Sequence, residues 1–167
     1  YYLKCSSSSE TVSAITGTSG NCYGAVAVTV RDVDPNTPIN DYEIGSATDV
    51  SGRWQLPRTT TTSDNCLNLF FGGNDGNRNP QVEPGMMRID TGPIKAGRMD
   101  YACAYTWQAT QGQIPQQHFW STKDRDNCNA FVVSLNSDND IAPPRSSLFE
   151  LPITPLSALN AFSTNDG

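Results

Sequence analysis

The sequence predicts an all-β protein, an antiparallel β-sandwich or jelly roll with long polar loops and a proline-containing C-terminal arm. Two observations predict this class. Apolar residues alternate with small or polar residues over several short stretches, and this alternation is the period of a half-buried strand. Clusters of Gly, Pro, Asn, Asp and Ser separate the stretches at intervals of roughly 8 to 12 residues, a spacing typical of sandwiches and barrels.

The predicted strands follow one another through most of the chain. They span residues 23–30, 42–50, 51–57, 66–71, 86–91, 101–109, 118–122, 129–135 and 148–153. Residues 59–65 are expected to form a polar loop or edge, and the glycine-rich stretch after Phe71 is expected to end its strand. In the clearest strand, 101–109, one face carries Tyr101, Cys103, Tyr105 and Trp107. We expect this aromatic face to pack into the core.

The chain of 167 residues fits one domain with a tail. We expect the sandwich to occupy residues 1–135, of which residues 1–22 are a Ser/Thr-rich entry segment. Residues 136–167 read as a linker or arm, with an edge strand at 148–153 and a short helix at 155–162. No signal peptide opens the sequence, which favours a processed product or an excised piece of a longer polypeptide.

Charge and hydropathy restrict the classes of partner. Charged residues make up 17 % of the chain and the net charge is −6, so the sequence lacks the basic footprint of a nucleic-acid-binding protein. No apolar stretch reaches the roughly 20 residues that a membrane helix needs. We therefore expect neither nucleic acid nor membrane insertion among its interactions.

The five cysteines form no CxxC pair, which argues against a zinc knuckle or a redox motif. Their wide spacing favours disulfides in an oxidising location, and we expect Cys5 to pair with Cys22 across the entry segment. The alternative is that all five are reduced and buried. No Asn-x-Ser/Thr acceptor occurs, which fits a bacterial surface protein or a virion protein assembled in the cytosol. The expected location is extracellular, on a cell surface or on a virion surface.

The stretch RDVDPNTPINDYE, residues 31–43, is the one candidate metal site. Its spacing resembles a calcium loop in the positions of Asp32, Asp34, Asn36 and Glu43. However, Thr37 stands where such a loop needs glycine, and Pro35 and Pro38 stiffen the backbone. The alternative is an acidic turn between strands. No other cofactor is expected.

A second group of residues suits recognition. The stretch QATQGQIPQQHFW places glutamines beside aromatic residues, a composition typical of binding surfaces. The candidate ligand-binding residues are Trp107, Gln117, His118, Phe119 and Trp120. The chain's single histidine, His118, could also act as an acid or base with Asp124 or Asp126, although no nucleophile motif accompanies it.

These observations favour a non-enzymatic structural or recognition domain displayed on a surface, such as a virus capsid projection or an adhesin or pilus subunit. It would assemble with copies of itself or attach to a host-surface glycan or protein. Two alternatives remain open. One is a secreted carbohydrate-binding module stabilised by calcium, and the other is a small secreted hydrolase that uses His118.

Overall fold

The computed structural model describes residues 26–47, 53–75, 80–95, 99–120 and 128–138. These residues form ten strands and no helix. The strands are β1 (Ile39–Ala47), β2 (Arg53–Gln55), β3 (Thr60–Thr61), β4 (Cys66–Asp75), β5 (Gln81–Val82), β6 (Met87–Lys95), β7 (Met99–Gln108), β8 (Gly112–Gln113), β9 (His118–Trp120) and β10 (Cys128–Asn136). Every pair of neighbouring strands is antiparallel, so the predicted all-β antiparallel class is confirmed.

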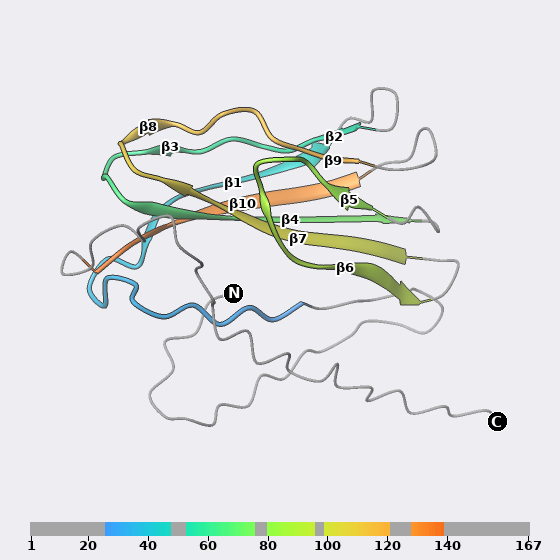
Figure 1. Ribbon diagram of the computed structural model, residues 1–167, viewed down its shortest axis with the longest axis horizontal. Helices are drawn as coiled ribbons and strands as arrows, with labels where there is room; N and C mark the ends of the chain where they lie inside the picture. Colours follow the sequence, from blue (N-terminus) through green and yellow to red (C-terminus); the bar gives the residue numbers. More distant parts are fainter. Residues whose placement is uncertain (1–25, 48–52, 76–79, 96–98, 121–127, 139–167) are drawn as a thin grey trace.

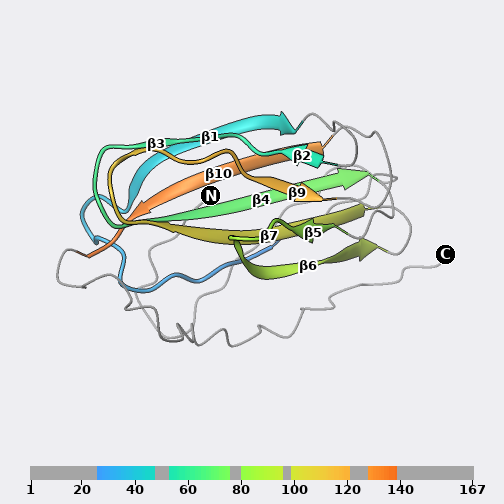
Figure 2. The same cartoon turned by 45° about the horizontal axis from the view of Figure 1, so that its top comes forward.

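One large sheet and two small ones make up this part of the chain. The large sheet has the strand order β1-β10-β4-β7-β6, and the small sheets have the orders β2-β9-β5 and β3-β8. Figures 1 and 2 show the short strands lying over one face of the large sheet. The core fills the space between them, because its buried residues come from both layers.

The strand pairing is nested. β1 pairs with β10, β2 with β9, β3 with β8 and β4 with β7, so each strand meets its counterpart counted from the other end. β5 and β6 join at a turn where Pro84 is followed by Gly85 at a φ of 99°. The described strands therefore form one long antiparallel hairpin that is folded back on itself. Three further ladders, β10 with β4, β9 with β5 and β6 with β7, hold this hairpin in its wound form.

Residues 53–61 run antiparallel to residues 112–120 and form one continuous two-stranded segment, here called the ribbon, which links the two small sheets. Arg53 pairs with Trp120 and Thr61 pairs with Gly112, and the same register holds at both ends. Between them, the Leu56 N–H donates to the carbonyl of Gln117 at 3.0 Å. Proline has no N–H to donate to a ladder, so Pro57 and Pro115 divide the ribbon into two short pairs.

The core combines large side chains from the small sheets with Phe70, Val132 and several small residues from the large sheet. Trp54, Leu56, Ile114 and Phe119 come from the ribbon, and they face Ala102, Ala104, Ala130 and Gly72. The expectation that the aromatic face of residues 101–109 fills the core is therefore wrong. The ribbon, together with Phe70 and Val132 of the large sheet, already supplies the bulk, and close packing leaves β7 room for only its small residues on this side.

Several predicted boundaries also change. Residues 26–30, expected to be a strand, form no ladder although Val28 and Val30 are half-buried. β4 continues through the glycines that were expected to end it, because Gly72 lies against the Phe119 ring. β5 and β8 were not predicted, since two-residue strands leave no periodic signal. The predicted strand at 148–153 and helix at 155–162 lie outside the described residues.

Buried polar groups at one end of the core form a hydrogen-bonded chain. The Ser134 hydroxyl lies 2.6 Å from the hydroxyl of Thr59 and donates to Asn68 Oδ1 at 2.7 Å. The Asn68 amide donates in turn to Thr106 and Gln108, each at 3.4 Å. These hydrogen bonds link Thr59, which precedes β3, to the centre of the large sheet. They satisfy polar groups that would otherwise be costly to bury.

Candidate functional site

The most unusual surface is the side of the large sheet that points away from the core, here called the outer face. The strand register arranges it in rows across all five strands. One row consists of Tyr42, Val133, Leu69, Tyr105 and Met87, and the next of Ile44, Phe131, Phe71, Cys103 and Asp90. Tyr101 and Trp107 extend the face along β7. Antiparallel sheets with one packed face usually turn polar residues to the other, so this face is unusual in being apolar.

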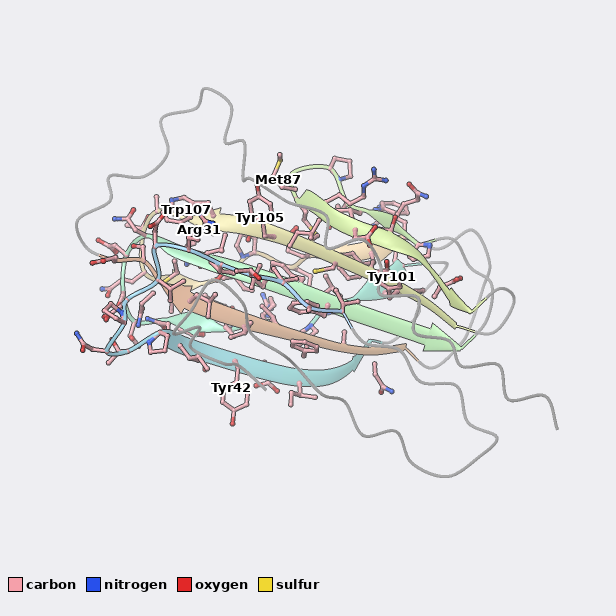
Figure 3. All side chains as sticks on the ribbon, turned by 90° about the horizontal axis from the view of Figure 1, so that it is seen from below. Arg31, Tyr42, Met87, Tyr101, Tyr105 and Trp107 are labelled. Carbon is pink, nitrogen blue, oxygen red and sulfur yellow. The ribbon has the colours of Figure 1, made fainter. Side chains whose placement is uncertain are left out.

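Exposure on the outer face is greatest toward its edges. Ile44 is 72 % exposed, Tyr42 64 % and Met87 56 %, whereas Cys103 in the middle is fully buried. Phe131 remains 42 % exposed although its ring stacks on that of Phe71, with centroids 4.4 Å apart. Figure 3 shows Tyr42 projecting from the sheet at β1 and Met87 at the opposite side. The β1 side therefore presents large apolar side chains in neighbouring positions.

The far end of the outer face is occupied by a segment of the chain itself. Val33 forms a bridge with Ser137, and the Asp34 N–H donates to the carbonyl of Asn136 at 3.0 Å. In Figure 3 the segment that begins at residue 26 crosses this face and brings Arg31 to the end that carries Trp107. The segment leaves Tyr42 and Ile44 exposed.

Two ionisable side chains of the outer face, Tyr101 and Cys103, are held in their neutral forms. The Tyr101 hydroxyl donates to Asp90 Oδ2. Burial, together with this bond and the charge of Asp90, raises the pKa of Tyr101 to about 12. Burial and the same charge raise the pKa of Cys103 to about 12. A thiol with that pKa is protonated at neutral pH, and the thiolate is the nucleophilic form, so Cys103 is suited to packing and not to catalysis.

The five predicted ligand-binding residues do not form one site. Trp107 lies on the outer face of the large sheet, whereas residues 117–120 belong to the ribbon on the other layer. Phe119 is fully buried and meets Trp54 edge-on with ring centroids 6.5 Å apart. It is a core residue, and its place in the predicted surface was wrong because alternation along β9 turns it inward.

His118 has a carboxylate partner that the sequence did not indicate. Its backbone N–H donates to Glu83 Oε2 at 2.8 Å, and its Nδ1 lies 3.1 Å from the same oxygen. Glu83 follows β5, and β5 pairs with β9, so the strand pairing brings the two together. This contact could have been found only from the two-residue strand β5. Asp124 and Asp126, the acids expected beside His118, lie outside the described residues.

Amide groups surround His118 on the ribbon surface. Gln55 donates to Gln116 at 3.0 Å, and the Gln116 amide donates to the carbonyls of Leu56 and Gln117. At the end of the ribbon the Arg53 guanidinium lies 3.9 Å from the centroid of the Trp120 ring. These contacts make a polar surface whose side chains largely bond to one another.

The candidate calcium stretch contains a hydrogen-bonded turn. Asp34 Oδ1 accepts from the backbone N–H groups of Asn36 and Thr37, and Oδ2 accepts from the Thr37 hydroxyl at 2.7 Å. These three bonds lower the pKa of Asp34, the Thr37 hydroxyl most. Such a turn is the alternative weighed for this stretch. Within the described ranges, no group of three or more His, Cys, Asp and Glu side chains could hold a metal ion.

Cys66 and Cys103 carry no disulfide. Cys66 and Cys103 are free and buried, which is the alternative considered for these residues. The Cys66 thiol donates to the carbonyl of Ser63 at 3.3 Å, and burial raises its pKa. The predicted pair of Cys5 with Cys22 lies outside the part of the chain that the structure describes.

Of the described residues, none belongs to a helix long and apolar enough to cross a membrane. Comparison of the chain with models of known protein families, with curated proteins and with solved structures finds no match.

Proposed function

We propose that this chain is a non-enzymatic structural domain that assembles with copies of itself into a protein shell or surface layer, of the kind found in virus capsids, adhesins and pili. The apolar outer face carries the proposal. A monomer in solution rarely leaves neighbouring large apolar side chains exposed, and such patches commonly mark interfaces. The location that this role requires is a virion or cell surface.

The nested strand pairing supports the same role. The strands form a long hairpin in which the first strand meets the last, and this hairpin is wound into two layers. That is the connectivity expected of a jelly roll. Jelly rolls build viral shells and also occur as lectins. Because a fold hosts many functions, this support is an analogy and the outer face remains the physical argument.

The test is the mass of the full chain in solution as a function of concentration. We expect sedimentation velocity to show reversible association that rises across the micromolar to millimolar range. Replacing Phe131 by Ser removes an exposed ring from the β1 side of the face and should weaken association at least tenfold. Gln55→Ser, on the opposite layer, is the matched control and should leave association unchanged.

Two measurements make the result decisive. Urea unfolding of Phe131→Ser must show a folded protein at the concentrations used, since its ring also stacks on Phe71. A wild-type chain that stays monomeric throughout the concentration range contradicts the proposal. Equal weakening by Gln55→Ser contradicts the assignment to the outer face.

A second candidate function is glycan recognition by the ribbon surface. The observation that favours it is the group of amides beside His118, because neutral hydrogen-bonding groups next to an aromatic ring suit sugar hydroxyls. A glycan array with the wild-type chain and with Gln116→Ala tests it. Binding that Gln116→Ala abolishes would support recognition, and an array without signal would remove this candidate.

The hydrolase alternative now depends on His118 and Glu83. A general acid or base must reach a bond that it can cleave, and a nucleophile or activated water must stand beside it. The contact observed also has a structural role, since one carboxylate oxygen holds both the backbone and the ring of His118. We therefore propose no catalytic role for this pair.

A further inference from the structure

The two edges of the large sheet differ in their capacity to add another strand. β6 forms one edge, and its register shifts twice, between Arg88 and Asp90 and between Pro93 and Lys95. Pro93 also lacks an N–H. Bulges and prolines are the usual means by which proteins block edge pairing. β6 is therefore a poor template for a further strand.

β1 forms the other edge and is regular over most of its length. Its register with β10 is unbroken from Asp41 to Ala47 and shifts only before Asp41. Side chains near its start are engaged by the ribbon: Asp41 accepts from the Thr60 N–H at 2.9 Å, and Asn40 accepts from that of Thr62. The Tyr42 N–H donates to Asp41 Oδ1 at 2.8 Å. Beyond these contacts, the described residues place β10 alone beside the strand from Glu43 to Ala47.

We propose that β1 is a two-fold interface, in which the β1 strands of two copies pair antiparallel with Ile44 opposite Ile44. This inference rests on the proposed self-assembly and names the strand that performs it. A two-fold axis through the sheet makes such an interface self-complementary, so one strand supplies both halves. The large sheets of the two copies then join into one.

The charges on β1 select this register. Opposite residues in an antiparallel pair point to the same face, so the pairing must keep outer-face residues together. With Ile44 on the axis, Tyr42 faces Ser46 of the second copy, Glu43 faces Gly45, and Asp41 faces Ala47. Shifting the axis to Glu43 would place two carboxylates directly opposite each other, which is destabilising. Shifting the axis to Gly45 would pair fewer residues and would place Ile44 opposite Ser46 of the second copy.

Exposure agrees with this arrangement. Ile44 is 72 % exposed and Tyr42 64 %, the two most exposed large apolar side chains among the described residues. Both belong to the part of β1 that the proposed pairing would use. In the pair, Ile44 would lie beside Ile44 of the second copy and Tyr42 beside that copy's Ser46, so both side chains would become less exposed. The apolar outer face would then extend across both copies.

Introducing a positive or a negative charge at Ile44 gives a test specific to the two-fold axis. In Ile44→Lys the two lysines of a dimer would lie opposite each other, and in Ile44→Asp the two carboxylates would. Each full-length variant alone should therefore associate at least tenfold more weakly than wild type. An equimolar mixture should recover dimers that contain one copy of each, because the two charges then attract across the axis.

A cross-link gives the second measurement. Opposite Cα atoms in antiparallel strands lie about 4.5 to 5.5 Å apart, which is within the range for a disulfide. Ile44→Cys should form a disulfide between two copies under mild oxidation, identified by mass spectrometry as residue 44 joined to residue 44. Met87→Cys, exposed on the opposite edge, is the matched control and should not join to itself.

The outcomes separate this inference from the proposed function. If wild type assembles and Phe131→Ser weakens it, but the Ile44 variants neither repel alone nor combine when mixed, the β1 interface is wrong while self-assembly stands. If wild type remains monomeric at every concentration, both fail. Recovery in the mixture, with the link from residue 44 to residue 44, supports both.

Discussion

Gly72 is the position where the structure predicts that one methyl group decides stability. A Cβ added there would lie 2.9 Å from Cδ2 and 3.1 Å from Cε2 of Phe119, and 3.6 Å from Cε3 of Trp54. Both rings are fully buried and pack edge-on against each other, so neither has free space to move into. Overpacking of this kind costs about 1–3 kcal/mol.

The neighbouring glycine provides the matched control. A Cβ at Gly73 would meet only the Asp100 carbonyl oxygen at 3.8 Å, an ordinary contact. Replacing glycine by alanine without strain stabilises a protein by about 0.4–1 kcal/mol, because the unfolded chain loses freedom. Gly72→Ala should therefore be about 2 kcal/mol less stable than Gly73→Ala. With a urea m-value of about 2 kcal/mol/M, their midpoints should differ by about 1 M.

The assay is urea unfolding followed by tryptophan fluorescence, which reports on buried Trp54. A double variant extends it: if the Phe119 ring causes the strain, Phe119→Leu should cost less in the Gly72→Ala background than in wild type. Equal midpoints for Gly72→Ala and Gly73→Ala would refute the argument that the Phe119 ring requires a glycine at position 72.

Two further predictions concern polar groups. Ser134→Ala should lower the free energy of unfolding by about 1–3 kcal/mol, because Asn68 Oδ1 would lose a buried donor; an unchanged urea midpoint would contradict this. Asp34→Ala should lower stability at neutral pH, and the difference from wild type should vanish as pH falls, because the lowered pKa means that the stabilisation is present above the unfolded pKa and lost as the carboxylate protonates. If the Asp34 carboxylate acts only in the turn, millimolar calcium should leave the melting temperature of both proteins unchanged, and a calcium-induced rise in wild type alone would show a metal site instead.

The strands with strong alternation could be predicted from the sequence, and their partners could not. Residues 101–109 and 129–135 match β7 and β10 closely, since period-two patterning is a local property. Which face of β7 meets the core depends on Trp54 and Phe119 of the ribbon, which lie outside the strand and its local pattern. Patterning therefore indicated two distinct faces, but not that the face with the alanines points inward.

The candidate site shows the same limit. The contact of His118 with Glu83 depends on pairing between β5 and β9, which no local signal reveals. Conversely, residues 26–30 show alternation without forming a ladder. Alternation in the sequence indicates only that one side of a segment is buried. An extended segment that crosses the face of a sheet has this pattern as well as a strand within a sheet does.

The size of the exposed patch indicates how assembly should proceed. Fully burying a side chain of the size of Ile44 or Phe131 stabilises by about 1.5–3 kcal/mol, and association costs an estimated 4–15 kcal/mol in lost motional freedom. Each copy brings three large side chains on the β1 side, and all of them are already partly buried in the single copy. They therefore support at most weak pairing, to which backbone hydrogen bonds along β1 would add. A copy held by two interfaces at once gains far more than one held by either, because the second contact forms at high effective concentration. Assembly of this chain should thus be weak between pairs and steeply concentration-dependent in larger complexes, as a shell or layer requires.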